Sequence, residues 1–397
     1  MLIGTVVVSA VNFAYQVTMA RTLGPASFGD VSVVATLLML GSAITLSFQL
    51  VCAKFVARNE SQNGKISVYS RLMKRAWIVG IAVAMALVLA RNGIASLLRL
   101  NNPYLIIFLA VAIAFSVPTG VKRGGLQGIC NFQSLNNNYV LEAVAKLVAA
   151  LTLVGIGYGI YGAVGAITIS VAAAFIFTPV RFPATPDSSA CIPASFREGF
   201  QAILFFVGQV VINNVDILLV KYFFSPQDAG LYAAVALFGR LLYYSSWAII
   251  TAMFPISAAA KPDEKPGRVL LTPLLLVLGM SVSFILVLLV IPHFLVALVF
   301  GESFARADSL LALYATATAL YALSVVLMTY EMSRKIANTG WLQLGMGGAL
   351  IVVISLLHQS LRQVIVIQIV IMVILLAAVS LPFLRKLTMP ARLPEAA

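Results

Sequence analysis

The sequence has too few charged side chains to cover a water-soluble surface. Only 10% of its 397 residues are charged, whereas a soluble domain has about 25%. Hydrophobic residues make up 61% and gather in uninterrupted runs such as residues 76–90 and 364–381. A transmembrane β-barrel would instead show short segments of alternating polar and apolar residues. The composition therefore excludes a soluble protein and a barrel, and it indicates a helical membrane protein.

Cysteines and catalytic motifs are also scarce. The three cysteines, Cys52, Cys130 and Cys191, do not have the spacing of metal ligands. The chain has no Gly-rich phosphate loop ending in Lys-Ser or Lys-Thr, and no Ser/His/Asp or Cys/His arrangement for nucleophilic catalysis. It also lacks an outer loop of the size that membrane-embedded glycan polymerases use. We therefore expect no enzymatic activity, no metal site and no cofactor.

What the chain has in abundance is apolar runs of roughly 20 residues, each long enough to span a bilayer. These runs predict about twelve transmembrane helices, separated by turn residues. The predicted spans are 2–20, 31–52, 76–95, 104–120, 139–157, 160–180, 199–220, 229–252, 269–291, 309–330, 340–357 and 363–383.

The distribution of Lys and Arg predicts how these spans are oriented. The net charge is +13, and the basic residues are about three times as frequent on one side of the spans as on the other. Cytoplasmic loops and anionic lipid headgroups account for this excess, so nucleic acid is not an expected partner. We expect both chain ends in the cytoplasm.

An internal repeat divides the chain into two halves. Residues 25–29 and residues 226–230 both read Pro-x-x-x-Gly, and at the same offset Asn12 corresponds to Asn213. An offset of six spans preserves orientation, which predicts two parallel repeats with a substrate path between them. We expect a six-helix bundle at 1–182, a cytoplasmic linker at 183–198, a second bundle at 199–385 and a cytoplasmic tail at 386–397.

Several runs resemble the Wzx-type polysaccharide and O-antigen flippases. These belong to the polysaccharide transport branch of the multidrug/oligosaccharidyl-lipid/polysaccharide exporter superfamily. The resemblance rests on residues 19–30 (Met-Ala-Arg-Thr-Leu-Gly-Pro-Ala-Ser-Phe-Gly-Asp), residues 214–232 and residues 298–304, with Phe254-Pro255 and residues 126–128 in support. It covers nearly the whole chain.

The resemblance implies a V-shaped pair of six-helix bundles in the bacterial inner membrane. Its implied activity is the flipping of polyprenyl-diphosphate-linked oligosaccharide across that membrane, for lipopolysaccharide or exopolysaccharide synthesis. Expected partners are the lipid-linked substrate, the bilayer, a polysaccharide polymerase and glycosyltransferases. The related lipid II flippases usually carry two further helices, which this sequence lacks.

Ionisable residues inside spans are costly and therefore rank as candidate functional groups. Glu142 and Lys146 lie four residues apart in the fifth span. In one interpretation they neutralise each other within the helix. In the other, Lys146 lies on a cavity wall and binds a phosphate, while Glu142 sets its charge and is a candidate coupling or gating group.

The seventh and eighth spans carry the other two intramembrane charges. Gln209, Asn213 and Asp216 recur on one face of the seventh span. They form either a cation or proton site or a seam of helix–helix hydrogen bonds. Arg240 of the eighth span is followed on the same face by Tyr243, Tyr244 and Trp247. An Arg fork matches a diphosphate and aromatic rings stack on sugars. Alternatively, Arg240 pairs with Asp216 and only fixes packing.

The remaining candidates are polar side chains on the first span. Asn12, Tyr15 and Gln16 share one face of it, where they contact either a hydroxyl-rich sugar or a neighbouring helix. The alternative function is a cation-coupled multidrug or small-metabolite exporter of the same fold. A third reading is a scaffold for glycan assembly. The intramembrane charges of Glu142, Asp216, Lys146 and Arg240 sum to zero, which does not favour a cationic drug.

Overall fold

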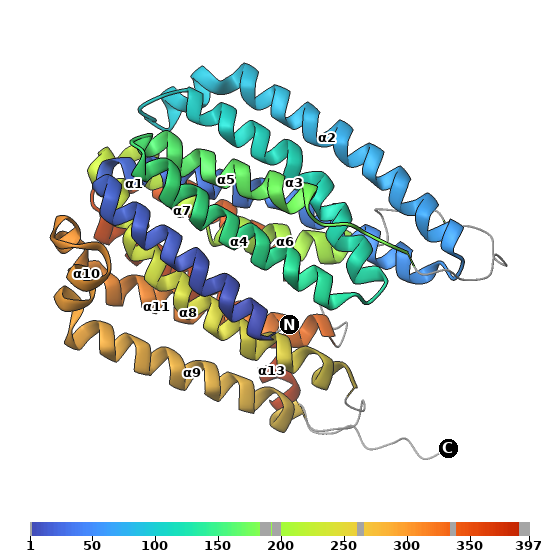
Figure 1. Cartoon of the computed structure of the whole chain (residues 1–397). Helices are drawn as coiled ribbons and strands as arrows, with labels where there is room; N and C mark the ends of the chain where they lie inside the picture. Colours follow the sequence, from blue (N-terminus) through green and yellow to red (C-terminus); the bar gives the residue numbers. More distant parts are fainter. Residues whose placement is uncertain (1, 183–191, 193–199, 260–265, 334–338, 389–397) are drawn as a thin grey trace, which may run out of the picture. The chain divides into compact units, whose positions relative to one another are not determined.

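A computed structural model describes residues 2–182, 192, 200–259, 266–333 and 339–388, and all the regular secondary structure in these residues is helical. Figure 1 shows the arrangement. The helices are α1 (Leu2–Arg58), α2 (Gln62–Leu97), α3 (Tyr104–Gly128), α4 (Phe132–Gly155), α5 (Gly159–Ile176), α6 (Phe200–Ile212), α7 (Val215–Phe223), α8 (Pro226–Ala259), α9 (Pro266–Val290), α10 (Pro292–Phe300), the 3₁₀ helix η2 (Glu302–Ala307), α11 (Asp308–Ser333), α12 (Thr339–Leu356) and α13 (Leu361–Thr388).

The all-α polytopic class is confirmed. Eleven helices in the described residues are long and apolar enough to cross a membrane. One of them, α1, contains the first two predicted spans, because a kink at Gly24 divides it. Gly24 has a φ of 72°, in the left-handed region that a glycine adopts without a steric penalty. Pro25 then begins the second leg, where its missing N–H costs nothing.

Several helix bounds differ from the predicted spans. The helix α2 begins at Gln62, well before the apolar run, and α3 continues to Gly128. The predicted seventh span is two helices, since α6 ends at Ile212 and α7 begins at Val215. The whole segment, residues 203–223, is nevertheless long and apolar enough to cross a membrane, so the predicted span is confirmed with a break inside it. Hydropathy measures only whether a segment is apolar, so it detects neither polar helix extensions nor a break within an apolar run.

The chain forms two compact units. Unit 1 comprises Met1–Leu237 and His293–Asp308, and unit 2 comprises Phe238–Pro292 and Ser309–Ala397. The boundary between the two units falls inside α8, between Leu237 and Phe238. The division into two sequence halves stays a prediction. The predicted linker and tail lie outside the described residues, apart from residue 192 and residues 386–388.

Close contacts between glycine and backbone hold α1 against α3 in unit 1. Gly120, Gly124 and Gly128 recur every four residues on α3. A Cβ added to Gly120 would lie 2.4 Å from the carbonyl oxygen of Thr45, and one added to Gly124 would lie 2.4 Å from that of Gln49. Helices pack through such small-residue stripes inside membranes, where no hydrophobic effect drives them together. The stripe therefore fixes which face of α1 meets α3.

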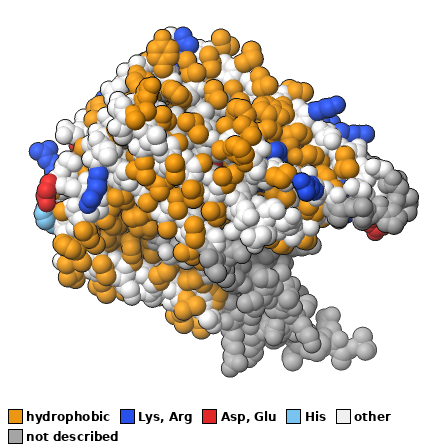
Figure 2. All heavy atoms as spheres, viewed as in Figure 1, with side chains coloured by type: hydrophobic (Ala, Val, Ile, Leu, Met, Phe, Trp, Pro, Cys, Tyr) orange, Lys and Arg blue, Asp and Glu red, His pale blue; other side chains and the backbone are white. Residues whose placement is uncertain are grey.

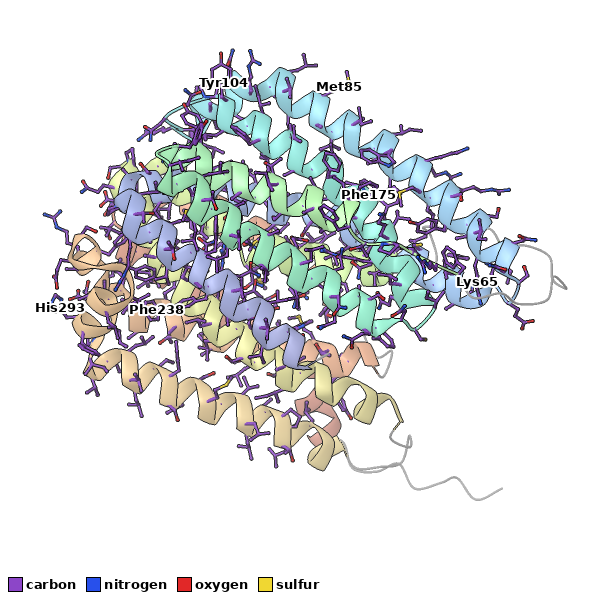
Figure 3. All side chains as sticks on the ribbon, viewed as in Figure 1. Lys65, Met85, Tyr104, Phe175, Phe238 and His293 are labelled. Carbon is purple, nitrogen blue, oxygen red and sulfur yellow. The ribbon has the colours of Figure 1, made fainter. Side chains whose placement is uncertain are left out.

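The surface is apolar, as a lipid-facing surface must be. Hydrophobic side chains cover most of the face in Figure 2, and Lys and Arg are few. The helix α2 exposes Ile78, Met85 and Leu89 at 68%, 60% and 84%. Figure 3 shows Lys65 and Tyr104 at opposite ends of the α2–α3 pair, with Met85 pointing outward between them. This pattern agrees with a multi-pass membrane protein.

We expect Gly124→Ala to destabilise unit 1 by about 2 kcal/mol, because an added methyl group would collide with backbone that has no room to move. Thermal unfolding of the purified protein in detergent would measure the loss. Gly93→Ala is the matched control, since a Cβ there meets nothing within 4 Å. An equal midpoint for Gly124→Ala and Gly93→Ala would contradict the stripe.

Candidate functional site

The candidate site in unit 1 begins with an ion pair that the sequence did not predict. Arg123 lies on α3 beyond the predicted end of its span, and it pairs with Glu142 of α4. Its Nε donates to Asn138 Oδ1 at 2.6 Å, and its guanidinium lies 4.1 Å from the centroid of the Tyr139 ring. Glu142 therefore has an interhelical cation as its partner. The interpretation that Glu142 and Lys146 neutralise each other within the helix stays a prediction.

This pair is part of a polar network that joins four helices of unit 1. Asn138 Nδ2 donates to the carbonyl oxygen of Ala174 at 2.8 Å and to Thr178 Oγ1 at 2.7 Å. On the other side, Gln49 Nε2 donates to Gln127 Oε1 at 3.2 Å and lies 3.4 Å from the Tyr139 hydroxyl. Because the network satisfies most of its own donors and acceptors, its first role is to fix the helices.

Lys146 lies one turn beyond Glu142 and keeps hydrogen-bonding capacity. Its Nζ is 5.2 Å from the centroid of the Tyr15 ring, and it makes no hydrogen bond or ion pair within the described part of the chain. The Tyr15 hydroxyl donates to the carbonyl oxygen of Ala163 at 2.9 Å. Three donors on a lysine ammonium thus remain available for a ligand.

Two acceptors on α1 are also unsatisfied. Asn12 Oδ1 and Gln16 Oε1 are buried, and neither accepts a hydrogen bond from the described residues. They lie one turn apart, on either side of Tyr15 in the sequence. Buried polar atoms are usually hydrogen-bonded, so such acceptors call for an explanation. The predicted residues Asn12, Gln16 and Lys146 thus all lie in unit 1 and have unused polar capacity, and Lys146 contacts the ring of Tyr15, which stands between Asn12 and Gln16 in the sequence.

The third group in unit 1 surrounds the break between α6 and α7. Asp216 lies in the first turn of α7, fully buried, and its Oδ2 accepts from the Tyr232 hydroxyl at 2.9 Å. A carboxylate there is favoured by the positive end of the helix dipole. Asn213 Nδ2 donates within its own segment to the carbonyl oxygen of Gln209 at 2.9 Å. The predicted continuous polar stripe is therefore interrupted.

Unit 2 contains an aromatic cluster on α8 and α11. The Tyr243 ring stacks near-parallel on Trp247, at 6.1 Å and 28°, and on Tyr321, at 5.8 Å and 29°. Tyr244 meets Tyr243 at 5.7 Å with tilted rings and is 46% exposed. The Tyr321 hydroxyl donates to Gln343 Oε1 at 3.2 Å, which holds the stack in place. The α8 residues of this stack were predicted, whereas Gln343 was missed.

Arg240 lies one turn before the aromatic cluster and is half-buried. It belongs to unit 2, whereas Asp216 belongs to unit 1. Their pairing therefore stays a prediction.

The sequence reading also missed Asp30 and Lys221. These residues form an ion pair in unit 1, and both side chains are 0% exposed. Lys221 lies just beyond the predicted end of the seventh span, and the sequence gives Asp30 no role of its own. The sequence offered one indication of their contact, which is that each lies near one copy of the repeated Pro-x-x-x-Gly motif.

A comparison of sequences finds one family. The model of a family described as polysaccharide biosynthesis protein matches residues 18–309. No curated protein sequence matches at a significant level.

Solved structures share the fold at low sequence identity. An inward-facing multidrug resistance MATE family transporter of the MOP superfamily matches with a TM-score of 0.76 at 14% identity, covering 97% of this chain and 100% of that one. The lipid II flippase MurJ, in an inward closed conformation, matches with a TM-score of 0.76 at 12% identity, covering 96% and 86%. A MOP superfamily transporter from Pyrococcus furiosus matches with a TM-score of 0.61 at 14% identity, covering 98% and 95%.

We expect Arg123→Met to destabilise unit 1 by about 2–3 kcal/mol, because Glu142 loses its cation inside the bundle. The loss should fall short of that for a fully buried pair, since the Glu142 side chain is 28% exposed. Thermal unfolding in detergent would measure it. The double variant Arg123→Met/Glu142→Gln removes both charges and should recover most of the loss. If the double variant is no more stable than the single, the ion pair is not what the network depends on.

Proposed function

The chain belongs to the polysaccharide biosynthesis protein family, and from that membership we propose that it flips polyprenyl-diphosphate-linked oligosaccharide across the cytoplasmic membrane. The observation that carries the proposal is the family match on a chain with the MOP fold, because a polysaccharide biosynthesis protein built almost wholly of membrane spans is suited to moving the glycan. Among the proteins that share this fold is the lipid II flippase MurJ.

The proposed substrate has three chemically different parts. Its lipid tail stays in the bilayer, its diphosphate needs cations, and its sugars need hydrogen-bonding groups and apolar faces. Lys146 in unit 1 and Arg240 in unit 2 are the proposed contacts for the diphosphate. A lysine offers a point charge with three donors, and an arginine offers a planar fork that matches two phosphate oxygens.

The sugars are proposed to contact polar and aromatic groups. In unit 1, the unsatisfied oxygens of Asn12 and Gln16 are ready acceptors for sugar hydroxyls. In unit 2, Tyr243 is stacked between Trp247 and Tyr321, and the partly exposed Tyr244 and Trp247 rings offer faces and polar edges to a pyranose.

The proposed cycle is alternating access in the bacterial inner membrane, with both termini in the cytoplasm, driven by an ion gradient. Asp216, Glu142 and Asn213 are the proposed coupling or gating groups. Asp216 suits this role because it is fully buried in the first turn of α7, whereas Glu142 is paired with Arg123. The polymerase and glycosyltransferases of lipopolysaccharide or exopolysaccharide synthesis are the proposed partners.

The second candidate is a cation-coupled multidrug or small-metabolite exporter. It is favoured by the equal TM-scores of the multidrug transporter and the lipid II flippase. A cationic drug would prefer a cavity with excess negative charge. The intramembrane candidates of unit 1 are balanced, since Lys146 and Asp216 carry opposite charges and Glu142 is paired with Arg123. Resistance conferred on a pump-deficient host, with no effect on surface glycan, would favour this candidate.

This protein would be expressed in a bacterium that lacks its own polysaccharide flippase and that makes the glycan this protein exports. Its expression should restore the surface glycan, measured by lectin binding. Arg240→Ala and Lys146→Ala should each lower the restored glycan roughly tenfold or more, since a charge-assisted hydrogen bond contributes about 1.5–3 kcal/mol. The exposed Arg306→Ala is the matched control and should export normally. Full export by both variants would contradict the proposed diphosphate contacts.

Trp247→Ala should also lower export, because it removes one face of the aromatic stack, whereas Trp247→Phe should retain most of it. Trp341→Ala, at a tryptophan that is 59% exposed on α12, controls for the loss of a large aromatic side chain. Equal export by Trp247→Ala and Trp341→Ala would show that the stack does not contact the sugar.

A further inference from the structure

The two copies of the Pro-x-x-x-Gly motif lie against each other in unit 1. A Cβ added to Gly230, in the second copy, would lie 1.8 Å from the carbonyl oxygen of Pro25, in the first. A Cβ added to Gly29 would lie 3.1 Å from the backbone nitrogen of Gly230. The segments at which the two repeats pass from their first to their second helix are therefore in backbone contact.

A buried ion pair closes this junction. Asp30 directly follows the first motif, and Lys221 lies on α7 a few residues before the second. Lys221 Nζ donates to Asp30 Oδ1, and both side chains are 0% exposed. The other oxygen, Asp30 Oδ2, accepts from the backbone nitrogen and the side-chain nitrogen of Asn101, at 3.2 and 2.8 Å. Both oxygens of the carboxylate are thus satisfied.

Further contacts surround the pair at the same end of the unit. Arg21, just before the α1 kink, donates from Nε to the carbonyl oxygen of Val299 at 2.9 Å. The rings of Phe28 and Phe304 meet edge to face at 6.0 Å. These contacts join α1 to α10 and η2, and Figure 3 labels His293 near the start of α10.

A pair of charges is better suited to a contact that opens and closes than to a permanent contact. A buried ion pair is often no more stabilising than an apolar pair of the same size, because each charge has lost its water. When the two charges separate into water, each recovers its hydration, so opening is not strongly opposed. When an apolar contact opens, its whole area is exposed to water at a cost. Leucines would therefore serve a permanent junction at least as well.

We propose that the Asp30–Lys221 ion pair closes the transport path on the side of the α1 kink, and that it breaks and reforms in each transport cycle. This inference rests on the proposed function, since it assumes a path between the repeats. Asp30 and Lys221 act as positioning residues and do not contact the substrate. Asn101 receives the Asp30 carboxylate in the closed state and sets its orientation.

The test uses the reactivity of a cysteine placed inside the junction. Ala229 lies in the second motif and is 3% exposed. Ala229→Cys would be introduced after Cys52, Cys130 and Cys191 have been replaced by serine. Isolated membranes with both sides accessible would then be treated with a charged maleimide, so that the result does not depend on orientation. Ser303→Cys, at an exposed position nearby, gives the rate for an open site.

Slow but measurable labelling is expected when Asp30 and Lys221 are intact, because the junction opens part of the time. Asp30→Asn or Lys221→Met should label at least about tenfold faster, since the remaining unpaired charge favours the open, hydrated state. The double variant Asp30→Asn/Lys221→Met has no charge to hydrate and should return toward the slow rate. Gly124→Ala, which should loosen unit 1 away from the junction, should leave the reporter protected.

Two results would overturn the inference. One is an Ala229→Cys thiol that stays protected from the maleimide in both single variants. This result counts only if each variant elutes as a folded species in size-exclusion chromatography and the Ser303→Cys thiol labels fully. The other is a double variant that labels as fast as the singles, which would indicate general loosening. Labelling needs no substrate. If labelling follows the charges while glycan export fails, the gate stands and the flippase proposal falls. If export succeeds while labelling ignores the charges, the reverse holds.

Discussion

A charge inside a helical bundle has little water to solvate it, so burying it is costly unless a group on another helix offsets it. This constraint explains the pairs that join unit 1. Arg123 of α3 is matched to Glu142 of α4, and Lys221 of α7 is matched to Asp30 of α1. Each pair fixes the rotation of two helices about their axes, because a helix turned by one residue would leave a charge facing lipid. The polar network thus sets the register within which the apolar surfaces pack.

The glycine contacts set the distance between neighbouring helix backbones, whereas the ion pairs set the rotation of the helices. A polar side chain can reach across an interface only if the two backbones are close enough. The α3 stripe brings Gln49 of α1 against Gly124 at van der Waals distance, and Gln49 then reaches Gln127 and Tyr139. The same logic recurs at Gly230, beside the Asp30–Lys221 pair. Small residues and buried charges therefore work together at both places.

A substrate can bind to the hydrogen-bond donors and acceptors that the packing of the helices leaves unsatisfied. Lys146, Asn12 and Gln16 hold donors and acceptors that the described residues do not engage. In unit 2 the aromatic stack on α8 is rigid because Tyr321 is tied to Gln343. A rigid ring face beside an arginine suits a ligand that carries both sugar and phosphate.

The sequence by itself determined the class, the approximate positions of the spans, the internal repeat and the family, because these depend on composition, hydropathy and local motifs. It also located most of the α8 aromatic cluster and the α1 polar face, since helical spacing predicts which residues share a face. Only the tertiary structure decided that Glu142 pairs with Arg123, that the seventh span breaks after Ile212, and that Asp30 meets Lys221. Periodicity describes one helix at a time, whereas the partner of a buried charge depends on how a second helix is rotated and how closely it approaches.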